Sequence, residues 1–114
     1  MKVLISSTGK DLESQIDPRF GRSLYSLIIE TVNMNIEPKI NGFSKNHDFS
    51  EIELVQEAIQ KGVKVVITGD LCVYAREALE NAGITVLENG QGTVKKALKQ
   101  LMEYEYEEVQ FPCT

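Results

Sequence analysis

The first 40 residues carry short apolar runs that are typical of strands. These runs cover residues 2–6, 23–32 and 34–40. The second and third surround a polar turn at Asn33, which predicts an antiparallel pair. Pro38 places the third run at an edge of the sheet, because proline has no N–H group to donate to a strand ladder.

After Phe49 the apolar residues recur with the period of a helix, about 3.6 positions. Ser50 and Glu53 have the spacing of a capping box, so a first helix is expected to begin there and to end near Gly62. One apolar stripe along it consists of Ile52, Leu54, Val55, Ala58 and Ile59. Such a stripe is typical of a helix that packs on a core.

Two further strands alternate with two further helices. Residues 63–68 and 84–87 are predicted to be buried strands, and helices are predicted over 71–82, with Asp70 as N-cap, and from Thr93 onwards. The inner face of the last helix carries Val94, Ala97, Leu98 and Leu101. Strand–helix–strand crossovers favour parallel, right-handed connections. The sequence therefore predicts an α/β fold with a mixed five-stranded sheet and three helices.

The composition is that of one ordinary globular domain. The chain has 114 residues, of which 42% are hydrophobic and 25% charged. We assign residues 1–104 to the domain and 105–114 to an acidic tail. The net charge of −5 and the absence of a basic stripe argue against a nucleic-acid partner. The opening apolar run is too short for a signal peptide or a membrane span, so we expect a cytoplasmic protein with no membrane partner.

Four stretches resemble the dinitrogenase iron-molybdenum cofactor family, which includes nitrogenase accessory proteins. They are the DPRFGR motif at 17–22 followed by a strand, GVKVVITG at 62–69, AGI at 82–84 and GQGTV at 90–94. The resemblance covers nearly the whole chain. It implies a three-layer ribonuclease-H-like fold with strand order 3-2-1-4-5. It also implies a role in binding or carrying an iron- or molybdenum-containing cluster.

Ligands of open α/β sheets bind beyond the carboxyl ends of the parallel strands. That rule selects three loops, at residues 7–21, 69–72 and 88–92. Two helices begin from these loops, and their free N–H groups are expected to favour an anion such as thiomolybdate, an anionic cluster or phosphate. The candidate binding residues are Ser7, Arg19, Phe20, Gly21, Arg22, Thr68, Gly69, Asp70, Gly90 and Gly92.

The candidate metal ligands are Cys72 and His47. Cys72 is expected in the first turn of the second predicted helix, where the dipole favours a thiolate; the alternative is a small side chain packed under the helix start. His47 lies where the family carries a histidine-containing loop, and the alternative is a surface residue. Cys113 is assigned to a frayed end, and both thiols are expected to be reduced.

Other candidates also have structural alternatives. Arg19 and Arg22 either clamp an anion or form salt bridges with the abundant carboxylates. Phe20 is more often a core residue than a ligand platform. Gly90 and Gly92 precede a helix but lack the lysine and spacing of a nucleotide loop, so tight turning is the simpler interpretation.

The leading hypothesis is a non-enzymatic carrier of a metal cluster or its oxyanion precursor, with a protein partner in cofactor assembly. One alternative is a magnesium-dependent phosphoesterase of ribonuclease-H-like type. That chemistry needs converging carboxylates, and the acids available near strand ends are Asp11, Asp17, Asp70 and Glu88. Another is a regulatory module that docks a partner through the acidic segment 103–108.

Overall fold

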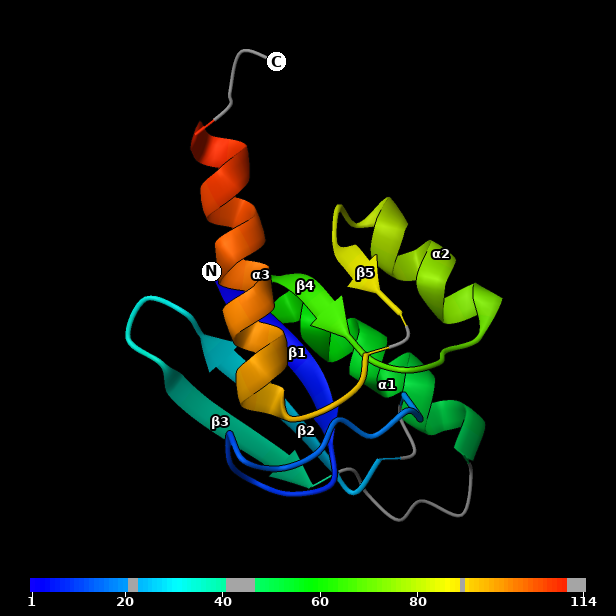
Figure 1. Cartoon of the computed structure of the whole chain (residues 1–114). Helices are drawn as coiled ribbons and strands as arrows, with labels where there is room; N and C mark the ends of the chain where they lie inside the picture. The colour runs from blue at the N-terminus through cyan, green and yellow to red at the C-terminus, as the bar shows by residue number, and fades with distance from the viewer. Residues whose placement is uncertain (21–22, 41–46, 89, 111–114) are drawn as a thin grey trace.

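A mixed five-stranded sheet lies at the centre of the computed structural model, which describes residues 1–20, 23–40, 47–88 and 90–110 (Figure 1). The elements are β1 (Lys2–Ser7), β2 (Tyr25–Glu30), β3 (Asn35–Ile40), α1 (His47–Gln60), β4 (Val63–Ile67), α2 (Val73–Asn81), β5 (Thr85–Leu87) and α3 (Val94–Gln110). The strand order is β3-β2-β1-β4-β5. β1 and β3 each pair with β2 antiparallel, whereas β4 is parallel to β1 and β5 is parallel to β4. The predicted fold class and strand order are confirmed.

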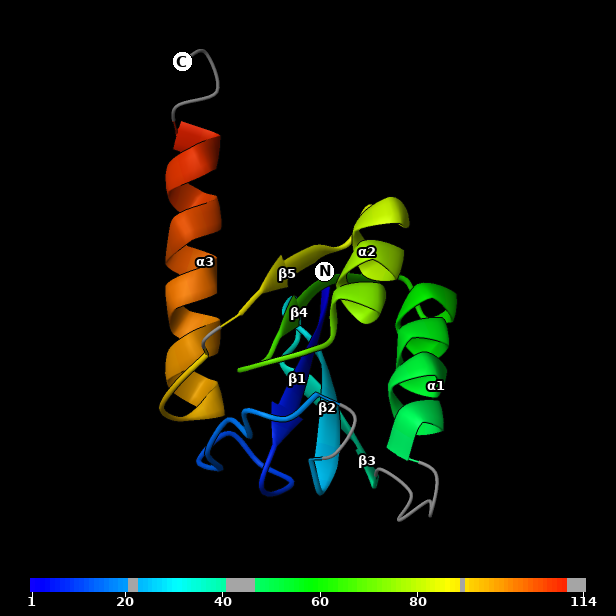
Figure 2. The same cartoon turned by 90° about the vertical axis from the view of Figure 1, so that its right-hand side faces the viewer.

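The helices cover both faces of the sheet. α1 and α2 pack on one face and α3 packs on the other, so the domain has three layers (Figure 2). Successive side chains of a strand point to opposite faces. Leu4 of β1 accordingly joins the core under α1 and α2, whereas Val3 and Ile5 join the core under α3. These layers are compatible with the expected ribonuclease-H-like fold.

Two predicted helix starts are wrong. α1 begins at His47, so Ser50 lies inside the helix and is not its cap. The spacing of Ser50 and Glu53 does not distinguish a cap from an interior position. α2 begins at Val73, and its N-cap is Cys72, whose Sγ accepts a hydrogen bond from Ala75 N at 3.4 Å.

Three apolar side chains are more exposed than their patterns indicate. The stripe of α1 is split, because Leu54, Val55 and Ala58 are buried whereas Ile52 and Ile59 are 47% and 46% exposed. β5 is an edge strand, and Leu87 is 39% exposed, so the prediction of a buried strand is wrong there. An apolar pattern indicates that a surface is hydrophobic, but it does not indicate whether another element covers that surface.

α3 continues past the end of the sheet to Gln110 (Figure 1). The segment assigned to an acidic tail therefore begins within this helix, and Cys113 lies outside the described residues. None of the helices in the described part of the chain is long and apolar enough to cross a lipid bilayer.

Ion pairs join the edge strand β3 to α1. Lys61, just after α1, pairs with Glu37 of β3, and its Nζ lies 3.5 Å from Glu57 Oε2. The hydrogen bond from Lys61 lowers the pKa of Glu37 below its ordinary value of 4.5, and the same bond raises the pKa of Lys61 above 10.5. Because these groups are close to the surface, we expect the pair to contribute only about 0.2–1 kcal/mol.

The contribution of this pair is expected to depend on pH. A lowered carboxyl pKa stabilises the folded state above about pH 4.5, and this stabilisation is lost as the pH falls through the folded-state pKa. We expect Glu37→Gln to lower the urea midpoint slightly at pH 7 and to have a smaller effect at about pH 3, because more of the wild-type carboxyl is then protonated. An equal loss at both pH values would show that the charge of Glu37 is not responsible.

Candidate functional site

The three loops selected from the sequence meet at one rim of the sheet. The loop after β1 contacts both of the others. Phe20 N donates to Asp70 O at 3.1 Å, and Ile16 N donates to Gly92 O at 2.9 Å. The prediction of a common rim is confirmed for the described residues, because β1, β4 and β5 are parallel and end at the same edge.

The two glycines of these loops that face neighbouring segments allow close packing. A Cβ added at Gly69 would overlap Pro18 Cα and would lie 2.9 Å from the carbonyl oxygen of Pro18. A Cβ at Gly90 would lie 3.1 Å from a methyl carbon of Ile67. The backbone of Gly69 is therefore packed directly on the loop after β1, and Gly90 is packed against the end of β4.

In the DPRF motif, the predicted anion-binding residue Arg19 forms a salt bridge with Asp17. The buried Asp17 carboxylate accepts hydrogen bonds from Arg19 N at 2.9 Å and from its Nε and Nη2 at 3.2 Å each. The side-chain hydrogen bonds to Asp17, together with its negative charge, raise the pKa of Arg19. Of the two alternatives for Arg19, the salt bridge is the one seen here. Phe20 is buried in the core under α1 and α2, and Gly21 and Arg22 lie outside the described residues.

The hydroxyl candidates at the rim have internal partners. Ser7 and Thr68 are completely buried. Thr68 Oγ1 lies 2.7 Å from Ser6 Oγ, and Ser7 Oγ donates to Gly9 O at 2.8 Å. These hydroxyls hold the strand ends and the first loop together, and they do not face the surface.

The expectation of free N–H groups at the start of α3 is wrong. Val94 N donates to Ser14 O and Lys95 N donates to Leu12 O, both at 2.9 Å. Lys96 N donates to Thr93 Oγ1 at 3.2 Å. The loop after β1 folds back over this helix start and supplies the acceptors that an anion would otherwise provide.

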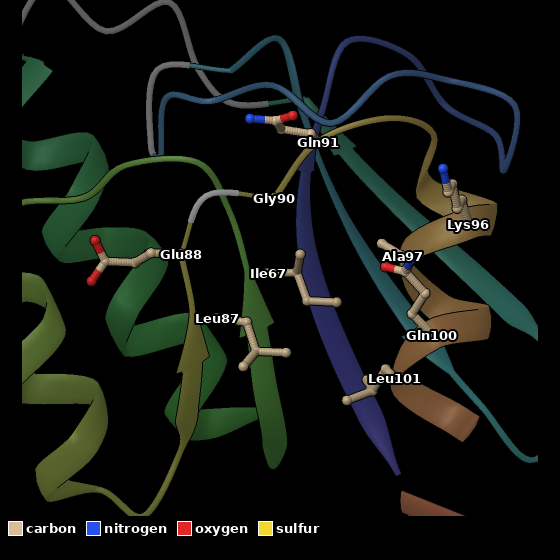
Figure 3. Close-up of a pocket in the computed structure, with 9 residues that line it drawn as sticks. All are labelled: Ile67, Leu87, Glu88, Gly90, Gln91, Lys96, Ala97, Gln100 and Leu101. Atoms are coloured by element: carbon tan, nitrogen blue, oxygen red, sulfur yellow. The ribbon is translucent and has the colours of Figure 1, made fainter. Parts of the chain in front are cut away.

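A groove of about 720 Å³ opens beside this rim, between α3 and the carboxyl ends of β4 and β5 (Figure 3). It exists because α3 lies over the part of this sheet face that is away from β5. The edge strand β5 is therefore left partly uncovered. The groove is lined by Ile67, Leu87, Glu88, Gly90, Gln91, Lys96, Ala97, Gln100 and Leu101.

The groove combines an apolar floor with polar groups. Ile67, Leu87 and Leu101 supply apolar surface, and Gln91 and Lys96 lie at the end nearest the rim loops (Figure 3). Glu88 points away from the groove, toward α2, where it pairs with Arg76. Among the described lining residues, Lys96 is therefore the charged side chain that has no ion-pair partner.

Sequence reasoning selected Gly90 and the loop 88–92, which contributes other polar lining residues, but it missed Lys96 and Gln100. Lys96 and Gln100 are on the outward side of α3, one helical turn apart, which is the spacing of neighbours on a helix surface. That spacing alone does not distinguish a binding surface from an ordinary solvated face. What turns it into a site is the position of α3 relative to β5, which the local pattern does not contain.

Cys72, one of the two candidate metal ligands, is not among the residues that line this groove. Cys72 is exposed at the N-cap of α2, on the other face of the sheet, and Cys72 N donates to Glu51 Oε1 at 3.3 Å. His47 is the first residue of α1, and its side chain lies outside the described residues. In the described part of the chain, no group of three His, Cys, Asp or Glu residues is placed to hold a metal ion.

The carboxylates required by a phosphoesterase do not converge among the described residues. Asp17 is bound to Arg19, Glu88 pairs with Arg76, and Asp11 accepts from Ser14 Oγ at 3.1 Å. The described structure therefore offers no support for this alternative.

Residues 1–104 match the family model described as dinitrogenase iron-molybdenum cofactor. The chain belongs to this family. The resemblance seen in the sequence is thereby confirmed, and membership relates the protein to the handling of iron and molybdenum cofactors. The comparison with curated proteins gave no match.

Two solved structures of similar proteins agree with the fold of this family member. The apo form of the orange protein from Desulfovibrio gigas has a TM-score of 0.79 and 26% identity, covering 90% of this chain and 87% of that chain. A candidate NifB protein from Thermotoga, described as belonging to the DUF35 family, has a TM-score of 0.74 and 34% identity over the same shares of the two chains.

Proposed function

We propose that this protein binds or carries an iron- or molybdenum-containing cluster, or its oxyanion precursor, during metallocofactor assembly. We further propose that it does so without catalysing a reaction. The observation that carries the proposal is the groove between α3 and β5, which lies beside the carboxyl rim of a family member. Ligands of open α/β sheets bind at this rim.

The chemistry of the groove suits a preassembled anionic cargo. Lys96 supplies a positive charge, and the amides of Gln91 and Gln100 supply N–H donors. The apolar floor suits the weakly hydrated sulfur surface of a cluster or thioanion. The cargo is held as a whole through its outer atoms, and no protein ligand to the metal is required.

The proposal is tested by anaerobic reconstitution with iron, sulfide and tetrathiomolybdate. We expect charge-transfer absorption and bound metal to persist after desalting. Failure of the wild-type protein to retain metal under several such conditions would contradict the carrier role.

Replacing Lys96 with glutamine is expected to reduce the retained metal severalfold, because the charge in the groove is lost. Lys99→Gln is the matched control, since it removes the same charge from the same helix at an exposed residue that does not line the groove. Metal per protein after desalting is the measurement. Equal losses in both variants would indicate a general charge effect and would remove the groove from the proposal.

A further inference from the structure

A second groove lies on the opposite face of the sheet, between α1 and α2. Its volume is about 450 Å³. The lining residues are Glu51, Ile52, Val55, Gln56, Ile59, Cys72, Tyr74, Ala75 and Ala78. α3, which borders the groove of the proposed carrier site (the cargo groove), packs on the other face of the sheet (Figure 2), so the two grooves share no lining residue.

The exposed apolar side chains of this groove are concentrated in one place. Ile52 and Ile59 lie two turns apart on α1 and are each nearly half exposed, and Tyr74 of α2 is 78% exposed. Single exposed apolar residues are ordinary, but a contiguous apolar groove on a small domain marks an interaction surface.

The arrangement of the two helices that border the groove suits a third helix as its occupant. α1 and α2 run side by side on this face (Figure 2). A third helix laid between two neighbours buries side chains at positions i, i+3, i+4 and i+7 of its own sequence. The two-turn separation of Ile52 and Ile59 provides contacts for such a stripe.

Charge indicates the kind of helix. Glu51 is the charged residue among the described residues that line the groove, and Glu77 of α2, one helical turn from Tyr74, is also exposed. α1 contains no Lys or Arg, and the single Arg of α2, Arg76, is paired with Glu88. A partner with Lys or Arg beside its apolar stripe complements this surface, whereas a second copy of the chain would bring the same acids into contact.

We infer that the groove between α1 and α2 docks an amphipathic helix of a partner protein, with an apolar stripe against Ile52, Ile59 and Tyr74 and a basic residue against Glu51. This surface leaves the cargo groove open. It therefore allows the protein to hold a partner and a cargo at the same time.

The inference is tested with a fluorescein-labelled Leu/Lys peptide of about four helical turns whose leucines share one face. We expect saturable binding by fluorescence anisotropy, with amide shift changes in α1 and α2 of the ¹⁵N-labelled protein. The comparison peptide has the same composition in an order that spreads the leucines around the helix. Equal binding of both peptides would overturn the inference, because it would show attraction to net charge alone.

Groove variants give the second arm of the test. The double variant Ile52→Ser, Ile59→Ser is expected to weaken peptide binding about tenfold or more, since buried anchors dominate interface affinity. Glu51→Gln is expected to weaken it less. Val32→Ser is the control, because Val32 is 85% exposed in the β2–β3 turn, away from the groove.

Unchanged binding by the folded double variant would overturn the inference. So would a wild-type dimer in sedimentation that the double variant abolishes, because the occupant would then be a second copy of the chain. Neither result bears on metal retention, so the carrier role is judged separately.

Discussion

We expect Gly69→Ala to lower the free energy of unfolding by about 2–3 kcal/mol, the cost of forcing an atom into a closely packed site. The added Cβ would overlap Pro18 Cα, which belongs to the backbone of the loop after β1. Backbone cannot move aside as the end of a flexible side chain can. The two loops must therefore separate, which also weakens the nearby hydrogen bond from Phe20 N to Asp70 O.

Gly62→Ala is the matched control for this prediction. Gly62 has a φ of +74°, but a Cβ there meets no atom within 4 Å. Its substitution should cost only the backbone strain of a left-handed residue, about 1 kcal/mol. Urea unfolding of both variants provides the measurement. If Gly69→Ala is no less stable than Gly62→Ala, the close approach of the two loops is not important for stability.

The sheet was predictable because its determinants are local. Short β-branched runs identify strands, Pro38 identifies an edge, and short crossovers through helices impose parallel pairing. Once β1, β4 and β5 are parallel, their following loops must reach the same rim. The meeting of these loops follows from topology and does not depend on any one side chain. The strand order itself came from the family resemblance.

The helix starts were less predictable because several residues compete for the same cap. Asp70 has the better N-cap side chain, yet its carbonyl accepts from Phe20 N, and Leu71 is buried against the core. The loop after β1 thus fixes residues 70 and 71 outside the helix, and Cys72 becomes the cap. This contact spans some 50 residues of sequence, so no local window reveals it.

The grooves were missed for a related reason. A helical stripe containing Ile52, Val55 and Ile59 has the same appearance whether the core covers all of it or only part. Likewise, Lys96 and Gln100 have the pattern of an ordinary solvated face. Their roles depend on where α2 and β5 end, and on which part of the sheet α3 leaves open.

Filling the cargo groove is expected to have the largest effect on function. Ala97 lies on α3 and lines this groove, where Ala97→Phe would place a ring between α3 and β5. We expect retained metal after anaerobic reconstitution to fall to about a tenth or less, because a filled pocket cannot enclose its ligand. Thermal unfolding followed by circular dichroism would establish that the variant is folded.

Ala78→Phe is the matched control, since Ala78 is a partly buried alanine of α2 that lines the groove between α1 and α2. It should retain metal at the wild-type level while losing affinity for the amphipathic Leu/Lys peptide, and Ala97→Phe should show the reverse pattern. The two results together would assign cargo to one face of the sheet and the partner helix to the other. Metal retention by a folded Ala97→Phe variant would show that the cargo binds elsewhere on the rim.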